Sequence, residues 1–195
     1  KGAVPEFRRF IETLDAPVGS TIMGGGACPG NHPLFTGMVG MHGSHASNMA
    51  TAECDLLIAV GCRFSDRVAT DPASFAANAK IVHIDIDRAE IDKNVKTCHH
   101  IVGDARRVLE LLNERLPQHD YAAWKAQVFA RKELPLKKDN LLHAHEILET
   151  ISDLTNGDAI IATDVGQHQM WSCQYYHFSR PGQLLTSGGF GTMGF

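Results

Sequence analysis

The sequence predicts an α/β fold, in which a parallel sheet is flanked by helices and part of a second α/β domain follows. Apolar runs that suit strands alternate along the 195 residues with stretches of helical periodicity. The runs end in glycine or polar residues, at the position where open α/β sheets bind ligands. Residues 56–60 form the clearest strand, because an unbroken apolar run that stops at Gly61 is typical of a central strand buried on both faces.

The first helix is predicted at residues 5–14, because its apolar residues recur at helical spacing and Pro5 suits a first turn. No strand precedes this helix, so the first strand–helix unit is incomplete. The same two patterns predict strands at residues 17–22, 80–87 and 99–102, and helices at residues 47–54, 105–116 and 121–134.

A polar, proline-containing stretch at residues 133–140 predicts a domain boundary. We divide the chain into a first domain at residues 1–120, a helix and linker at residues 121–140, and the start of a second domain at residues 141–195. The alternation of strands and helices stops in a glycine-rich loop at residues 187–195, so we expect the chain to be a piece of a longer polypeptide. The second domain is predicted to contain a helix at residues 142–154 and strands at residues 159–163 and 183–186.

The composition is that of a globular protein, with 44% hydrophobic and 21% charged residues. The net charge of -4 and the absence of a Lys/Arg cluster give no reason to expect nucleic acid. No apolar run approaches the roughly 18 residues that cross a membrane. The five cysteines are odd in number and scattered, which favours reduced thiols in the cytoplasm.

Eleven histidines invite a search for a metal site. His42 and His45 have no third ligand placed beside them. The neighbouring side chains of Cys98, His99 and His100 alternate between faces in a strand and do not converge. We therefore predict no metal site within the chain.

Two groups of residues after predicted strands are candidates for ligand binding. Arg63, Asp66 and Arg67 follow residues 56–60, and the planar guanidinium fork suits carboxylates and phosphates. The alternative is that Asp66 and Arg67 only pair with each other. Asp85 ends the next strand, where it could bind a ribose hydroxyl or cap the following turn.

Several longer motifs carry a family resemblance. They are P-G-N-H-P-L at residues 29–34, G-M-V-G-M-H-G at 37–43, G-C-R-F-S-D-R at 61–67, H-I-D-I-D-R-A-E-I at 83–91, T-D-V-G-Q-H-Q-M-W at 163–171 and S-G-G-F-G-T-M-G-F at 187–195. In this order they resemble the catalytic subunit of acetohydroxyacid synthases, also called acetolactate synthases, which are thiamine-diphosphate-dependent enzymes. The resemblance implies a Rossmann-like central domain at residues 1–120, without its first strand, and the start of the diphosphate-binding domain at residues 141–195.

The family decarboxylates pyruvate on thiamine diphosphate and transfers the hydroxyethyl group to pyruvate or 2-ketobutyrate, in branched-chain amino acid biosynthesis. The resemblance thus implies 2-ketoacid substrates, a homo-oligomer, and a small regulatory subunit as a further candidate partner. Arg67 matches the arginine that receives the carboxylate of the second ketoacid, and Asp66 would orient it. The residues that match contacts to thiamine diphosphate are Val165, Gly166, Gln167, His168, Gly191 and Met193.

The family also binds FAD. The positions that match its contacts are Thr21, Ile22, Met23, Met41, His42, Gly43, Arg63, Asp85, Ile86, Glu90, Gly103, Asp104, Gln169, Met170, Gly188 and Gly189. Gly25, Cys28, Ser65 and Phe190 depart from the usual pattern. A flavin-free catabolic acetolactate synthase, or another thiamine-diphosphate carboligase, is therefore an alternative within the same class.

The glutamate that activates the cofactor and the motif that binds Mg²⁺ both match regions outside the chain. We therefore expect the chain alone to be inactive. An alternative of another class is a flavin- or nucleotide-binding module without catalysis, which would explain Asp85 and the glycine loops.

Overall fold

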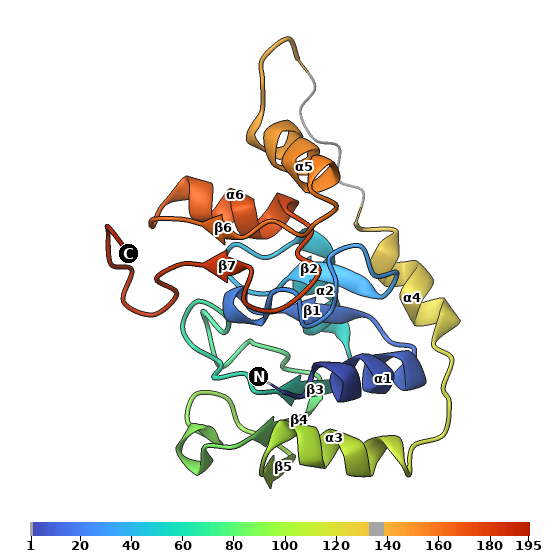
Figure 1. Cartoon of the computed structure of the whole chain (residues 1–195). Helices are drawn as coiled ribbons and strands as arrows, with labels where there is room; N and C mark the ends of the chain where they lie inside the picture. The colour runs from blue at the N-terminus through green and yellow to red at the C-terminus, as the bar shows by residue number, and fades with distance from the viewer. Residues whose placement is uncertain (1, 133–138) are drawn as a thin grey trace.

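The computed structural model describes residues 2–132 and 139–195 (Figure 1). Its helices are α1 (Val4–Leu14), α2 (His45–Glu53), α3 (Ala105–Asn113), α4 (Ala122–Phe129), α5 (Ala144–Leu154) and α6 (Gln167–Tyr175), with short 3-10 turns η1 (Ile22–Gly24) and η2 (Arg88–Glu90). Its strands are β1 (Val18–Ser20), β2 (Phe35–Met38), β3 (Leu56–Val60), β4 (Lys80–Asp85), β5 (His99–Val102), β6 (Ile161–Ala162) and β7 (Leu184–Leu185).

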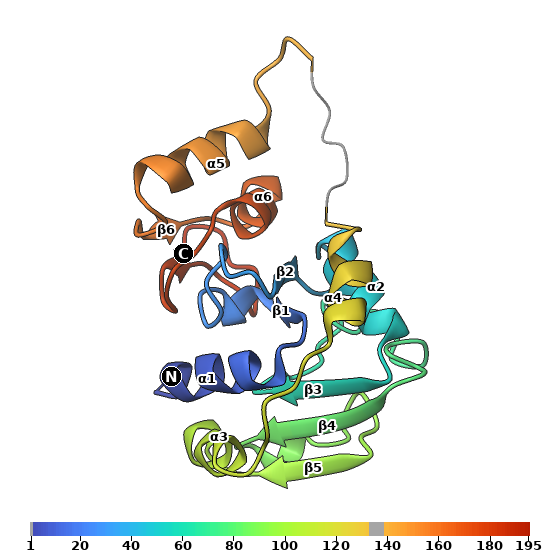
Figure 2. The ribbon, with the colours of Figure 1, turned by 90° about the vertical axis from the view of Figure 1, so that its right-hand side faces the viewer.

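Within the described residues the strands form three sheets, ordered β1–β2, β3–β4–β5 and β6–β7, and every pairing is parallel. Figure 2 shows β3, β4 and β5 side by side and pointing the same way. The predicted α/β class with parallel strands is confirmed. Because the strands of a sheet run in the same direction, the loops that follow β3, β4 and β5 lie at one edge.

Side-chain oxygens fix where several helices begin. Ser44 accepts a hydrogen bond from the Ser47 amide at the start of α2, and Asp104 accepts one from the Arg107 amide at the start of α3. These residues satisfy amide groups that the first helical turn leaves without partners. Both helices therefore start directly after the strand-end loops that carry the candidate residues.

Helices α1 and α3 pack across two sheets and join them. Phe10 of α1 and Leu109 of α3 are buried in one apolar cluster. The same cluster includes Val18 of β1 and Ile58 of β3. Burial of these side chains supplies the hydrophobic free energy that holds the separate β1–β2 and β3–β4–β5 sheets together.

The predicted strand at residues 56–60 exists and apolar clusters pack on both of its faces, but its side chains are less buried than predicted. Only Ala59 is buried, and Leu56 is 48% exposed. The reason is that, within residues 2–132 and 139–195, β3 pairs with β4 alone and forms an edge of its sheet. The strand predicted at residues 159–163 is likewise shorter and less buried, because β6 belongs to a sheet of two strands.

Two elements were not predicted. Strand β2 contains Gly37, which has a φ of 113° and lies within a stretch that reads as a glycine-rich loop. Helix α6 has no apolar stripe, because its buried residues include the polar Gln169 and Ser172. Both cases lack the periodicity by which a sequence reveals an element.

The helix predicted at residues 121–134 is present as α4, which packs on the first domain. Lys125 pairs with Asp15, and Arg131 Nη1 lies 2.7 Å from Glu53 Oε2. Most of the predicted linker at residues 133–140 lies outside the described residues. In the part that the structure describes, no helix has the length and apolar character needed to cross a bilayer.

We expect Leu109→Ala to lower the free energy of unfolding by about 2–5 kcal/mol, because it leaves a cavity under α1 and α3. Leu109 has no exposed surface, whereas Leu154 is 80% exposed. Leu154→Ala is therefore the control and should change stability far less. Urea unfolding of the chain would measure both, and equal losses would contradict the assignment of Leu109 to the main core.

Candidate functional site

Predicted flavin-binding residues lie together at the ends of β4 and β5. Asp85 is buried, and its Oδ1 accepts a hydrogen bond from the Asp87 amide at 2.9 Å. Its backbone carbonyl accepts one from the Gly103 amide at 2.9 Å. Asp85 therefore does cap the following turn. Its Oδ2 lies 3.7 Å from Nε2 of the fully buried His83.

His83 is a residue that the sequence reasoning did not select. Neither ring nitrogen has a hydrogen-bond partner among the described residues. The ring packs edge-on against Phe64, with 5.0 Å between the ring centroids. In the alternating pattern of β4, His83 occupies a position that faces the core. Nothing in the sequence therefore distinguished it from an ordinary buried residue.

The arginine loop after β3 contacts the loop after β2. The Met41 amide donates to the Arg67 carbonyl at 2.8 Å, and Arg67 Nη1 lies 3.8 Å from Met41 Sδ. Arg67 and Asp66 are both exposed. They form no ion pair with each other in residues 2–132 and 139–195, so the guanidinium faces solvent without a carboxylate partner.

A second group of candidate residues surrounds the start of α6. Gly166 precedes the helix with a φ of 149°, and Gln167 and His168 are exposed in its first turn. A Cβ on Gly191 would lie 3.8 Å from Val165 Cγ1, so these two residues are adjacent. Backbone N–H groups in the first turn of a helix have no intrahelical partners and favour an anion.

The terminal loop folds back onto the loop after β6. Asp164 Oδ1 accepts a hydrogen bond from the Gly194 amide at 2.6 Å. Met193, between Gly191 and Gly194, is 65% exposed. Core filling, the ordinary reason for a methionine, therefore does not account for Met193 in this structure.

Candidate residues of the first domain contact the second domain at two places. Met23 packs so closely on Gly188 that a Cβ there would overlap its sulfur. Gln174 of α6, which sequence reasoning also missed, donates through Nε2 to the His42 carbonyl at 2.8 Å. Gln169 differs from these, because it is buried and donates to Thr186 Oγ1 at 2.7 Å. The side-chain amide of Gln169 thus points into its own domain.

The remaining flavin candidates have different surroundings. Ile86 is 71% exposed, and Arg63 is exposed while its carbonyl accepts from Asn94 at 3.3 Å. Glu90 pairs with Lys93 at 2.8 Å but keeps one buried oxygen, Oε2, without a hydrogen bond in the described part. No group of three His, Cys, Asp or Glu side chains able to hold a metal ion occurs in the described ranges.

A small cavity of about 20 Å³ lies between the domains, with room for about one water molecule. Its lining includes Thr21, Cys28, Cys173 and Tyr176. Burial raises the pKa of the Cys28 thiol to about 11 and that of Cys173 to about 12. Both cysteines are therefore neutral, unreactive parts of the junction near neutral pH.

Models of known protein families match both parts of the chain. A model of the central domain of thiamine pyrophosphate enzymes matches residues 1–112. The chain belongs to the thiamine pyrophosphate enzyme family. A model of the C-terminal TPP-binding domain of these enzymes matches residues 164–195, which include the turn before α6 and the terminal loop.

Three relatives of the chain carry the name acetolactate synthase, one of them as a probable large subunit. The chain is 47% identical over 199 residues to the acetolactate synthase large subunit of Lactococcus lactis, and 44% identical over 209 residues to the probable large subunit of Methanocaldococcus jannaschii. It is 45% identical over 200 residues to the chloroplastic acetolactate synthase 2 of Nicotiana tabacum. These matches cover 100%, 100% and 97% of the chain, but 35%, 35% and 30% of the relatives. The resemblance carried by the motifs is confirmed.

We expect iodoacetamide at pH 8 to modify the exposed Cys98 in the folded chain well before Cys28 and Cys173. With pKa values near 11 and 12, the two junction thiols are ionised to only about one part in 10³ or less at that pH. Mass spectrometry of peptides would measure the order. Denatured chain is the control, and equal rates in the folded chain would contradict the burial of the junction cysteines.

Proposed function

We propose that the complete protein is an acetolactate synthase, which decarboxylates pyruvate and transfers the hydroxyethyl group to a second 2-ketoacid. The single observation that carries the proposal is similarity to acetolactate synthase large subunits over the whole chain, across both domains. The contacts of Met23 with Gly188 and of Gln174 with His42 support it, because they bring loops of the two domains together.

Thiamine diphosphate fits the turn before α6. Val165, Gly166, Gln167 and His168 would bind its diphosphate, because the first amides of α6 are available and Gly166 lets a ligand approach the backbone. Gly191 and Met193 lie on the neighbouring loop and would hold the aminopyrimidine. When bound, the cofactor supplies the carbanion chemistry, and these residues supply its placement. The Mg²⁺ ligands are assigned to regions outside this chain.

Arg67 would bind the carboxylate of the second ketoacid. Its exposed guanidinium has no acidic partner among the described side chains, and its backbone is tied to Met41. A guanidinium can donate two parallel hydrogen bonds to one carboxylate. Asp66, the adjacent residue, would orient it without neutralising it through a direct ion pair.

FAD is proposed as a second cofactor, along the edge that runs from β4 and β5 to the domain junction. Asp85 Oδ2, which accepts no hydrogen bond among the described residues and lies 3.7 Å from His83 Nε2, would bind a ribose hydroxyl. Met23 and Gly188 offer contacts from two domains. Branched-chain amino acid biosynthesis would be the pathway, and a homo-oligomer the assembly. The five free cysteines support the cytoplasm as the compartment.

The test compares the complete protein that contains this chain with the 195-residue chain by itself. Supplied with pyruvate, thiamine diphosphate, Mg²⁺ and FAD, the complete protein should form acetolactate, and the chain alone should form none. Acetolactate formed without flavin would favour the flavin-free alternative. Flavin binding by the complete protein without any acetolactate would instead favour a nucleotide-binding module.

In the complete protein, we expect Arg67→Ala to raise the KM for the acceptor ketoacid by roughly 10- to 150-fold, since a charge-assisted hydrogen bond contributes about 1.5–3 kcal/mol. Arg67→Lys should recover only part of the loss, because lysine lacks the planar fork. Arg107, which is exposed on α3, provides the control variant Arg107→Ala. Steady-state kinetics with two acceptors would measure the effect, and an unchanged KM and product ratio would falsify the assignment.

We also expect Gly166→Ala in the complete protein to weaken thiamine diphosphate binding about tenfold or more, because a Cβ strains this φ and narrows the anion site. Gly182 also has a positive φ but has open space around it, so Gly182→Ala controls for backbone strain alone. Isothermal titration would measure the affinity. Equal affinities of the two variants would remove Gly166 from the site.

A further inference from the structure

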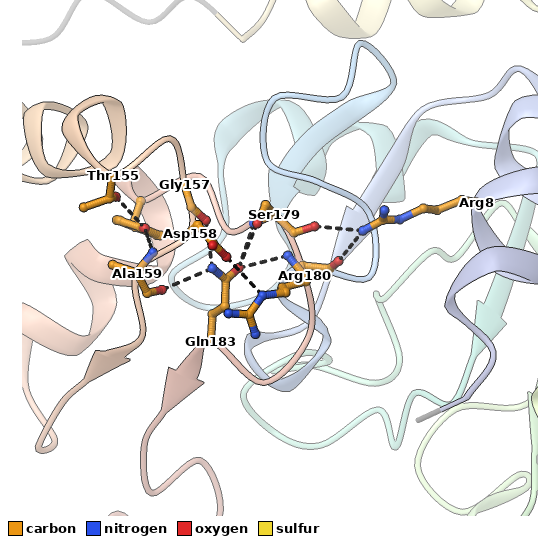
Figure 3. A network of polar contacts seen from close by, with 10 residues as sticks. Arg8, Thr155, Gly157, Asp158, Ala159, Ser179, Arg180 and Gln183 are labelled. Carbon is orange, nitrogen blue, oxygen red and sulfur yellow. Dashed lines mark hydrogen bonds and ion pairs between the residues drawn. The ribbon is translucent and has the colours of Figure 1, made fainter.

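One arginine of the first domain binds backbone carbonyls of both domains. Arg8 of α1 donates from Nε to the Ala27 carbonyl at 3.1 Å and from Nη2 to the Gly26 carbonyl at 3.1 Å. The same Nη2 donates to the Ser179 carbonyl at 2.8 Å (Figure 3). Such charge-assisted bonds are stronger than neutral ones, so Arg8 holds the loop after η1 against the turn that precedes β7.

Within the second domain, Gln183 holds the turn whose Ser179 carbonyl accepts the hydrogen bond from Arg8. Gln183 is fully buried, and its Oε1 accepts from the amides of Ser179 at 2.8 Å and Arg180 at 2.9 Å. Its Nε2 donates to the Gly157 carbonyl at 2.8 Å (Figure 3). Because the turn is anchored within its own domain, the Ser179 carbonyl presents a fixed acceptor to Arg8.

Glycines let the two backbones approach closely enough for these bonds. Gly26 has a φ of 79°, and a Cβ there would overlap the Arg180 carbonyl. A Cβ on Gly30 would lie 2.7 Å from His177 Cα, and the Gly30 amide donates to the Phe178 carbonyl at 2.9 Å. Direct contacts between the two backbones therefore fix the position of one domain against the other, which we call their register. Arg8 supplies a charged side chain at this contact.

The chain continues from both sides of this contact into candidate flavin-binding residues. Gly26 lies three residues after Met23, and the Ser179 turn leads through β7 to Gly188. Met23 and Gly188 then meet. We propose that Arg8 is a positioning residue, which sets the register between the domains so that Met23 and Gly188 form one wall of a flavin site. This proposal rests on the proposed function, since it assigns that wall to flavin.

Arg8→Met in the complete protein removes the donors and keeps much of the side-chain volume. Flavin affinity, measured by fluorescence titration, should fall about tenfold or more, because without these donors the arrangement that flavin binds becomes a minor population. Thiamine diphosphate affinity should stay close to that of Arg9→Met, the control at the exposed neighbouring arginine. Arg8→Lys should restore part of the flavin affinity.

A parallel fall in flavin affinity and thiamine diphosphate affinity would mean that Arg8 has only a structural role, and would overturn the proposal. Unchanged flavin affinity in Arg8→Met would overturn it as well. Gly26→Ala tests the same register without touching a charge, because its Cβ would push the two backbones apart. It should weaken flavin binding as Arg8→Met does, whereas Gly182→Ala, which has open space around it, should not.

Hydrogen–deuterium exchange separates this proposal from the proposed function. Without any cofactor, Arg8→Met should speed exchange in residues 23–30 and 176–181 compared with Arg9→Met. If the unaltered protein binds no flavin, the flavin assignment fails, and faster exchange would still support the role of Arg8 in setting the register. Unaltered exchange in both segments would overturn that role whatever the protein binds.

Discussion

The structure depends on one packing arrangement, in which α1 and α3 bury their apolar faces across two separate parallel sheets. Phe10 and Leu109 belong to a cluster that reaches Val18 on one sheet and Ile58 on the other. Isolated pairs of strands are marginally stable in water, so the two-stranded β1–β2 sheet depends on this packing. The helices therefore determine where the strand ends, and the loops that follow them, lie relative to one another.

Helix α1 has a second role at its polar face. The apolar face packs on the sheets, while Arg8 reaches the loop after η1 and the Ser179 turn. A movement of α1 would displace Phe10 and Arg8 together. The packing of the first domain and the register between the domains are therefore coupled through this one helix. The same helix that holds the first domain together also limits how the second domain can sit against it.

Much of the fold could be predicted, because β3 is an apolar run, β4 alternates between apolar and polar residues, and α1 shows helical periodicity. The missed elements have no such signal, since Gly37 interrupts β2 and α6 buries Gln169. At the site, motifs selected Gly166 and its neighbours, which the structure places at the start of α6. They could not reveal Arg8 or Gln174, because these side chains bond to backbone carbonyls of distant segments, which any residue sequence can supply.

The chemistry of the domain junction follows from its construction. Glycines and backbone carbonyls form several of its closest contacts, and the geometry there is held by hydrogen bonds to fixed acceptors. A ligand that contacts Met23 and Gly188 together would bind only the arrangement in which the domains have this register. It would stabilise that arrangement to the extent that it binds it more tightly than other arrangements. A cofactor shared between the domains would therefore act as an additional structural contact.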